Sequence, residues 1–240
     1  MKIFGNKEEF GITYTSYLEK YADDLDVIEN PDEYVLGGTI CFWVKGKNLF
    51  AFKDWGPDAT YGYYTLQYLI EFLTDDLVFH ISGPPFPVKT KATNGVDMVE
   101  ETALVKSDVK DQLGAYAQVD WANVNREVMG KIDYWICHSG FLGNRGGTFL
   151  PNLYVRRVCD KIELSWDNRH PHDNGENKFY LLHKKGVEYV DLKLYRDVVV
   201  EFCLAYIENI QEKEPDCANS HRENLQKAID MKLVFLKLIK

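Results

Sequence analysis

The sequence predicts an α+β fold in which mixed or antiparallel sheets and packed helices form two helix-on-sheet halves of one domain. Both halves contain short segments rich in β-branched and aromatic residues, bounded by glycine-containing turns, and both contain longer segments with apolar residues at helical spacing. The length of 240 residues favours a single domain over 1–240, with possible halves at 1–112 and 113–240.

In the first half, residues 2–4 and 10–18 are expected to be strands. The stretch TICFWVKGKNLFAF predicts a hairpin that turns at Lys45-Gly46-Lys47 and places Ile40, Phe42 and Val44 on one face. Apolar residues at helical spacing predict a helix over 61–76. The next segment, SGPPFPVKTKATNG, is expected to be a loop because proline removes backbone donors.

The second half begins with an expected helix that Asp120 caps and that ends near Gly140. Strands are expected at 152–158 and 161–166, joined by a tight Cys159-Asp160 turn, with Ile162, Leu164 and Trp166 on one face. A further strand pair, FYLLH and VEYVD, should precede a helix over about 192–213. The last helix is expected to begin at a capping box from Ser220 to Glu223.

Composition and charge limit the classes of function. A hydrophobic fraction of 45% and a charged fraction of 27% are typical of a soluble globular protein. The net charge of −9 disfavours nucleic-acid binding, and no apolar run reaches the length of a membrane span. Because the N-terminus has no features of a secretory signal, we expect a cytoplasmic protein. The acidic cluster Asp23, Asp24, Asp26 and Glu29 is a candidate for steering a basic protein partner.

Candidate metal ligands and cysteine pairs are few. His170 and His172 flank a proline and precede Asp173 and Glu176, but no third ligand is dictated and no HExxH is present, so neither a metal nor a cofactor is expected. The five cysteines are an odd number, widely spaced and without a CxxC pair. We therefore expect small buried thiols rather than a disulfide framework.

The stretch 138–168 contains the most chemically suggestive residues. Its GNRGG loop lacks the P-loop pattern, and His138-Ser139 lacks a nucleophile elbow, so no catalytic residue is predicted there. The three glycines of the loop are expected to reverse the chain, and His138 to bind the terminal carbonyls of its helix. The polar residues that remain as candidates for one surface are Arg145, Arg156, Glu163, Asp167 and Asn168.

Two family resemblances follow from these segments. A helix end with HS, a loop ending in GG and the run TFLPNLYVRRVCDKIELSWDN resemble the non-catalytic N-terminal domain found ahead of ImmA/IrrE-type peptidases. ICFWVKGKNLFAF, YTLQYLIEFLTDD and the FPVK loop fit the same domain. EFGITYTSY followed by CFWVKG is also similar to immunity proteins of bacterial polymorphic-toxin systems. Together the resemblance covers most of residues 1–210.

The resemblance implies a bacterial immunity or antitoxin-like protein that binds a cognate toxin stoichiometrically. The peptidase half with its zinc-binding HExxH is absent, so protease activity is not implied. Two alternatives stay open, a ligand-sensing or regulatory module in a defence or toxin–antitoxin operon, and a hydrolase that uses the polar groups of 138–172. The predicted partner-binding residues are Asp23, Asp24, Asp26, Glu29, Arg145 and Asp167.

Overall fold

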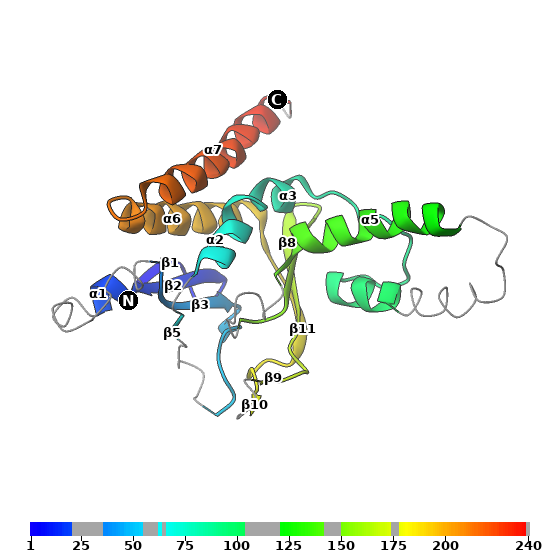
Figure 1. Cartoon of the computed structure of the whole chain (residues 1–240), viewed down its shortest axis with the longest axis horizontal. Coiled ribbons are helices and arrows are strands. Elements are labelled where there is room, and N and C mark those ends of the chain that lie inside the picture. Colours follow the sequence, from blue (N-terminus) through cyan, green and yellow to red (C-terminus); the bar gives the residue numbers. More distant parts are fainter. Residues whose placement is uncertain are drawn as a thin grey trace.

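The computed structural model describes residues 1–20, 36–54, 62–63, 66–103, 121–141, 150–173 and 178–238. These parts of the chain form antiparallel sheets of five and four strands, a separate two-stranded pair, and helices that pack against the larger sheets (Figure 1). The predicted α+β fold is therefore confirmed, and its sheets are antiparallel.

The first sheet is built from the N-terminal strands. Its order is β1-β2-β3-β4, and β5 pairs with β3. Lys45 and Gly46 turn the chain between β3 and β4 with φ values of 50° and 75°, as the left-handed turn of a two-residue hairpin requires. The hairpin and the buried face of Ile40, Phe42 and Val44 are confirmed. The strands are β1 (Lys2–Gly5), β2 (Phe10–Ser16), β3 (Gly38–Val44), β4 (Lys47–Asn48) and β5 (Gly62–Tyr63).

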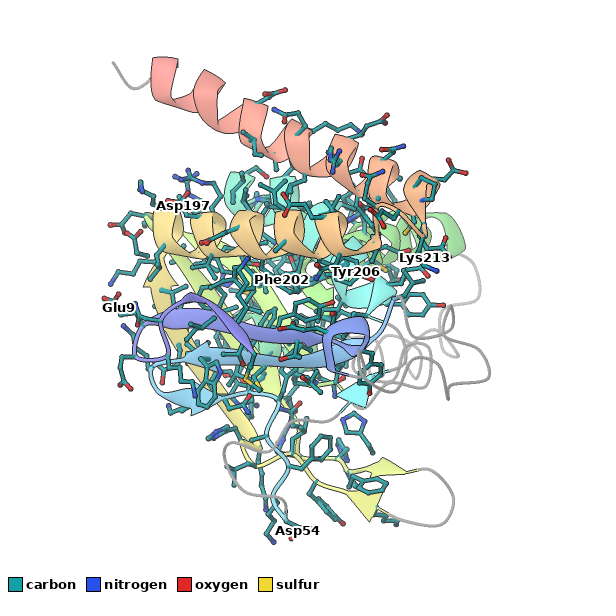
Figure 2. All side chains as sticks on the ribbon, turned by 90° about the vertical axis from the view of Figure 1, so that its left-hand side faces the viewer. Glu9, Asp54, Asp197, Phe202, Tyr206 and Lys213 are labelled. Atoms are coloured by element: carbon teal, nitrogen blue, oxygen red, sulfur yellow. The ribbon has the colours of Figure 1, made fainter. Side chains whose placement is uncertain are left out.

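Helix α6 (Leu192–Ile210) covers this sheet, and α7 (Pro215–Leu238) packs on the outer side of α6. Figure 2 shows Phe202 and Tyr206 between α6 and the strands. The Phe202 ring lies 5.7 Å from that of Phe4 and 5.5 Å from that of Tyr14, both edge-on. Burying a side chain of this size contributes about 2 to 3 kcal/mol, so these aromatic contacts fix α6 on the sheet.

The second sheet has the order β11-β8-β7-β6. Leu153 lies opposite Trp166 and Val155 opposite Leu164, so one face of the sheet is apolar and enters the core, as predicted for Ile162, Leu164 and Trp166. A two-stranded pair, β9 with β10, precedes β11. The strands are β6 (Gly140–Phe141), β7 (Leu153–Val158), β8 (Lys161–Asp167), β9 (His172–Asp173), β10 (Lys178–Phe179) and β11 (Lys185–Asp191).

One large cluster of buried side chains includes residues from both predicted halves, from Phe4 to Ala228. The predicted boundary near residue 112 lies outside the described residues. The other named helices lie between strands in the order of the chain, and residues 95–103 are also helical. These helices are α1 (Tyr17–Lys20), α2 (Gln67–Thr74), α3 (Leu77–Ser82) and α5 (Trp121–Ser139).

Two predicted elements differ from the structure because of long-range pairing. The helix expected over 61–76 begins at Gln67, since Gly62 and Tyr63 form β5 against β3. The expected pair FYLLH with VEYVD is wrong: β11 pairs with β8, β10 pairs with β9, and Leu181 bridges Phe52. Alternating apolar residues indicate a strand, but they do not choose its neighbour.

The last helix begins earlier than its capping pattern suggests. α7 starts at Pro215, five residues before Ser220, which lies exposed inside the helix. Proline is favoured in the first helical turn because its missing N–H has no helical acceptor there. The Ser220-to-Glu223 pattern is therefore not a helix start, and its prediction is wrong.

The cysteines are all free, but their burial is mixed. Cys41 and Cys203 are buried as expected, and burial raises the pKa of the Cys203 thiol. Cys137 and Cys159 are exposed, which corrects the expectation of buried thiols. Among the described residues, no helix combines the length and apolar character that crossing a membrane requires.

Candidate functional site

A groove of about 390 Å³ lies between α3, the proline-rich loop that follows it, and α5. We call it the proline–aromatic groove, because apolar rings dominate its walls. Ligand sites of proteins are concave and mostly apolar, which makes this groove the leading candidate site among the described residues. Its lining residues are Phe79, Pro84, Pro85, Pro87, Glu127, Gly130, Lys131, Tyr134 and Trp135.

The loop wall of the groove is held by contacts with α5 and β7. Gly83 ends α3 with a φ of 67°, and a Cβ there would lie 2.8 Å from the Arg157 side chain. The Trp135 indole N–H then donates to the Pro84 carbonyl at 3.4 Å, and the Phe86 ring packs edge-on against Trp135 at 4.9 Å. Prolines fix φ along this loop, so the wall has little conformational freedom.

The α5 wall is open at one residue. Gly130 lies in the middle of the helix, where glycine costs about 1 kcal/mol relative to alanine. Among the described residues, and apart from the backbone of its own helix, no atom lies within 4 Å of a Cβ built on Gly130. Tyr134, one turn later, is 60% exposed, and Lys131 pairs with Glu127 at 2.8 Å on the same wall. The helix therefore leaves space in the groove and presents an aromatic ring beside it.

A histidine pair lies behind the groove. His80 is fully buried, and its Nε2 lies 3.1 Å from the His138 carbonyl oxygen. Because a carbonyl only accepts, Nε2 carries the proton, and Nδ1 accepts from the Tyr195 hydroxyl at 3.2 Å. Burial lowers the pKa of His80 to about 3. His80 is thus a neutral link between α3, α5 and α6.

The His138 ring contacts a carboxylate on another segment. Its Nδ1 lies 2.5 Å from Oδ1 of Asp76, and the ring packs against Tyr134 and Phe79 with centroids 4.2 and 5.3 Å away. The predicted position of His138 in the last turn of α5 is confirmed. The prediction that its side chain interacts with the terminal carbonyls of the helix is wrong, because the ring contacts Asp76 instead. The neighbouring Ser139 is buried with no hydrogen-bond partner among the described residues, so the two adjacent side chains form no base–nucleophile contact.

The predicted polar surface of the second sheet is partly an internal network. Glu163 is fully buried. Its Oε1 accepts from the Gly95 N–H at 2.7 Å, and its Oε2 lies 2.6 Å from Arg156 and 3.2 Å from the Tyr189 hydroxyl. The carboxylate therefore sits at the N-terminus of the helical residues 95–103, where the helix dipole favours negative charge.

Asp167, one of the predicted partner-binding residues, is engaged within the chain. Arg169 bonds its carboxylate through Nε at 2.8 Å and also pairs with Glu100. The Arg169 guanidinium lowers the pKa of Asp167 to about 2. Asn168 likewise accepts from the Asn152 N–H at 2.8 Å. These side chains join the sheet to neighbouring segments.

The other predicted site residues lie in parts of the chain that are not described: Asp23, Asp24, Asp26, Glu29, Arg145, and Glu176 of the loop considered for a metal. His170 is exposed, while His172 lies in β9, where burial lowers its pKa. Within the described ranges, no three His, Cys, Asp or Glu side chains are grouped to hold a metal ion.

The groove was not predicted from the sequence. Two signals point toward it in retrospect, the glycine inside an apolar-striped helix and the PPFP run followed far along the chain by Tyr134-Trp135. Neither signal shows that the two segments meet, because their contact depends on the packing of α3 and α5.

Comparison of the chain with protein-family models, curated proteins and solved structures finds no match. The resemblance to immunity proteins and to the domain ahead of ImmA/IrrE-type peptidases therefore remains a prediction from sequence.

Proposed function

We propose that this protein is an immunity or antitoxin-like protein that neutralises a cognate bacterial toxin by stoichiometric binding, and that the proline–aromatic groove receives an apolar side chain of the toxin. The observation that carries the proposal is the exposed Tyr134 ring beside an open, apolar groove of about 390 Å³. Tyrosine and tryptophan beside pockets are typical of the residues that dominate binding energy at interfaces.

The rigidity of the groove supports a binding role. Prolines fix one wall, and the Trp135 N–H bond to Pro84 joins that wall to α5. Binding then requires little ordering of the chain, which lowers the entropic cost of association. Val128, also exposed on α5, lines a second and smaller pocket of about 120 Å³.

Charge supports a protein partner of opposite sign. The net charge of −9 attracts a basic toxin, and we assign the cluster Asp23, Asp24, Asp26 and Glu29 to the steering of that encounter. Such charges act mainly on the association rate. Association should therefore slow as salt concentration rises, while dissociation changes much less.

The groove can be tested by filling it. Gly130→Phe places a ring where a Cβ meets no described atom outside its own helix backbone, so the fold should be retained while the groove is blocked. We expect the variant to lose most of its protection when it is co-expressed with the toxic product of the adjacent gene. Glu201→Phe, which adds the same ring on an exposed position of α6, is the matched control and should protect fully. Equal protection by both variants would contradict the role of the groove.

Stoichiometry separates binding from catalysis. Growth rescue by a binder should saturate when the two proteins are present in equal amounts, whereas an enzyme would protect at a small fraction of the toxin level. Rescue at a large deficit of this protein would favour the hydrolase alternative, for which the Asp76–His138 pair at 2.5 Å would be the group to mutate.

A ligand-sensing module is the second candidate. The groove volume of about 390 Å³ lies within the roughly 300 to 1,000 Å³ of typical small-molecule sites. A small molecule that raises the melting temperature of the wild type but not of Gly130→Phe would favour this alternative.

A further inference from the structure

Among the strands that the structure describes, β11 forms one edge of the second sheet, since it pairs with β8 and with no other of them. The hydrogen bonds at the two ends of this ladder show which backbone groups face outward. Asn168 N–H donates to the Lys184 carbonyl at 2.5 Å, and Leu192 N–H donates to the Asp160 carbonyl at 3.1 Å. Along an antiparallel ladder, hydrogen-bonded residue pairs alternate with pairs that are not hydrogen-bonded. The even-numbered residues of β11 therefore form backbone hydrogen bonds to β8. The odd-numbered residues direct their N–H and C=O groups away from the sheet.

These outward-facing residues are Lys185, Val187, Tyr189 and Asp191. No backbone hydrogen bond is made by the N–H or C=O of Val187 or Tyr189 at this edge within the described residues. Natural edge strands are protected by a central lysine, a proline or a bulge. The central residue of β11, Glu188, is paired with Lys47, and the outward-facing residues on either side of it are Val187 and Tyr189. The pairing of β11 with β8 is continuous over all seven residues.

Two exposed apolar side chains belong to this edge strand. Val187 and Tyr189 are 37% and 38% exposed. An open strand edge with apolar side chains is the type of surface to which another strand adds.

We propose that β11 pairs with β11 of a second copy of this chain in antiparallel orientation, about a two-fold axis at Glu188. This register places Val187 opposite Tyr189 of the second copy and Lys185 opposite Asp191 of the second copy. Aromatic with β-branched pairs and opposite charges are the favourable cross-strand neighbours. Every outward-facing residue of β11 then has a complementary partner, and the two four-stranded sheets join into one.

The charged groups of this register have free bonding capacity. The Lys185 ammonium has three donors and bonds Asp97 at 2.7 Å and Glu100 at 2.8 Å. Asp191 caps α6 through Oδ1, which accepts a hydrogen bond from Leu194 N–H. Its second carboxylate oxygen can accept from Lys185 of the second copy. The two Glu188 side chains meet at the axis on the other face of the sheet. Each is paired with its own Lys47 at 2.5 Å, so their mutual repulsion is compensated.

Cross-linking tests the register. In a background with Cys137→Ser and Cys159→Ser, which removes the exposed native thiols, Glu188→Cys should form an intermolecular disulfide under mild oxidation. Facing residues at such an axis have Cα atoms about 4.5 Å apart, within the range that a disulfide spans. Val187→Cys is the matched control. It should not cross-link, because position 187 of one copy lies diagonally across the axis from position 187 of the other copy. Cross-linking of Val187→Cys in place of Glu188→Cys would overturn the proposal.

The mass in solution tests the pairing itself. By light scattering the wild-type chain should be a dimer that dissociates on dilution. Val187→Pro should be monomeric, because it removes an outward N–H that β8 does not use, whereas Val187→Thr keeps that N–H and should remain dimeric. Circular dichroism confirms folding, and the cross-linking readout remains if the proline variant fails to fold. If the wild-type chain is monomeric at all concentrations, pairing with a second copy is refuted. The same holds if the monomer binds only a strand of another protein.

Discussion

Trp166 shows how much of this core depends on one side chain. It is 2% exposed and lies over Gly186 of β11, where an added Cβ would be 2.4 Å from the indole Cζ2. Its position opposite Leu153 follows from the ladder between β7 and β8. The alternation of IELSW in the sequence predicts that Trp166 faces inward, but it does not predict that a glycine on another strand makes room for the ring.

Trp166→Ala should lower the free energy of unfolding by about 3 to 5 kcal/mol, because it removes a large buried side chain and leaves a cavity. Trp166→Phe is the control. It fills much of the space and also removes an indole N–H that has no hydrogen-bond partner among the described residues, so it should cost less. Urea denaturation measures both changes. A loss below about 1 kcal/mol for the alanine variant would show that Trp166 is not part of the core.

At the scale of elements, local pattern and long-range pairing had separate roles. The longer strands of both large sheets and the helix α6 were predictable, because period-2 and period-3.6 patterns record which side chains are buried, whereas the two-residue strands β5 and β6 were not. The start of α2 and the partner of β11 were not, since both depend on which strands become neighbours. The groove could not be predicted from the sequence for the same reason. Neither α3 nor the helical residues 95–103 were predicted, and α3 forms one wall of the groove.

The helical residues 95–103 offer a test at this scale, because buried Glu163 accepts their first N–H and pairs with Arg156 at 2.6 Å. Glu163→Gln should cost about 3 to 5 kcal/mol, as expected when one partner of a buried ion pair is removed. Hydrogen exchange should accelerate selectively in 95–103. Glu100→Gln, which breaks partly exposed pairs of the same segment with Arg169 and Lys185, should have a much smaller effect. Similar losses in both variants would mean that Glu163 does not anchor this segment.

For the whole molecule, buried histidines set the dependence of stability on pH. Burial lowers the pKa of His80 to about 3 and also lowers the pKa values of His172, His183 and His221. All four shifts have the same sign, so the unfolded chain binds protons more readily than the folded protein once the pH falls below the ordinary histidine value of 6.5. Protons therefore favour unfolding in this range. Aspartates such as Asp97 and Asp167, whose pKa values are lowered by Lys185 and Arg169, add to the loss only below their ordinary value of 3.8.

We therefore expect the free energy of unfolding to fall as pH decreases from about 6.5 toward 4. The contribution of His80 approaches about 1.4 kcal/mol per pH unit where the histidine is charged only in the unfolded chain. Denaturant titrations at a series of pH values measure this slope. His80→Gln lowers stability at every pH because it disturbs the bonds to Tyr195 and the His138 carbonyl, but it removes one titrating group, so its slope should be smaller than that of the wild type. The slope is independent of the overall loss in stability, and an unchanged slope would show that His80 is not held neutral in the core.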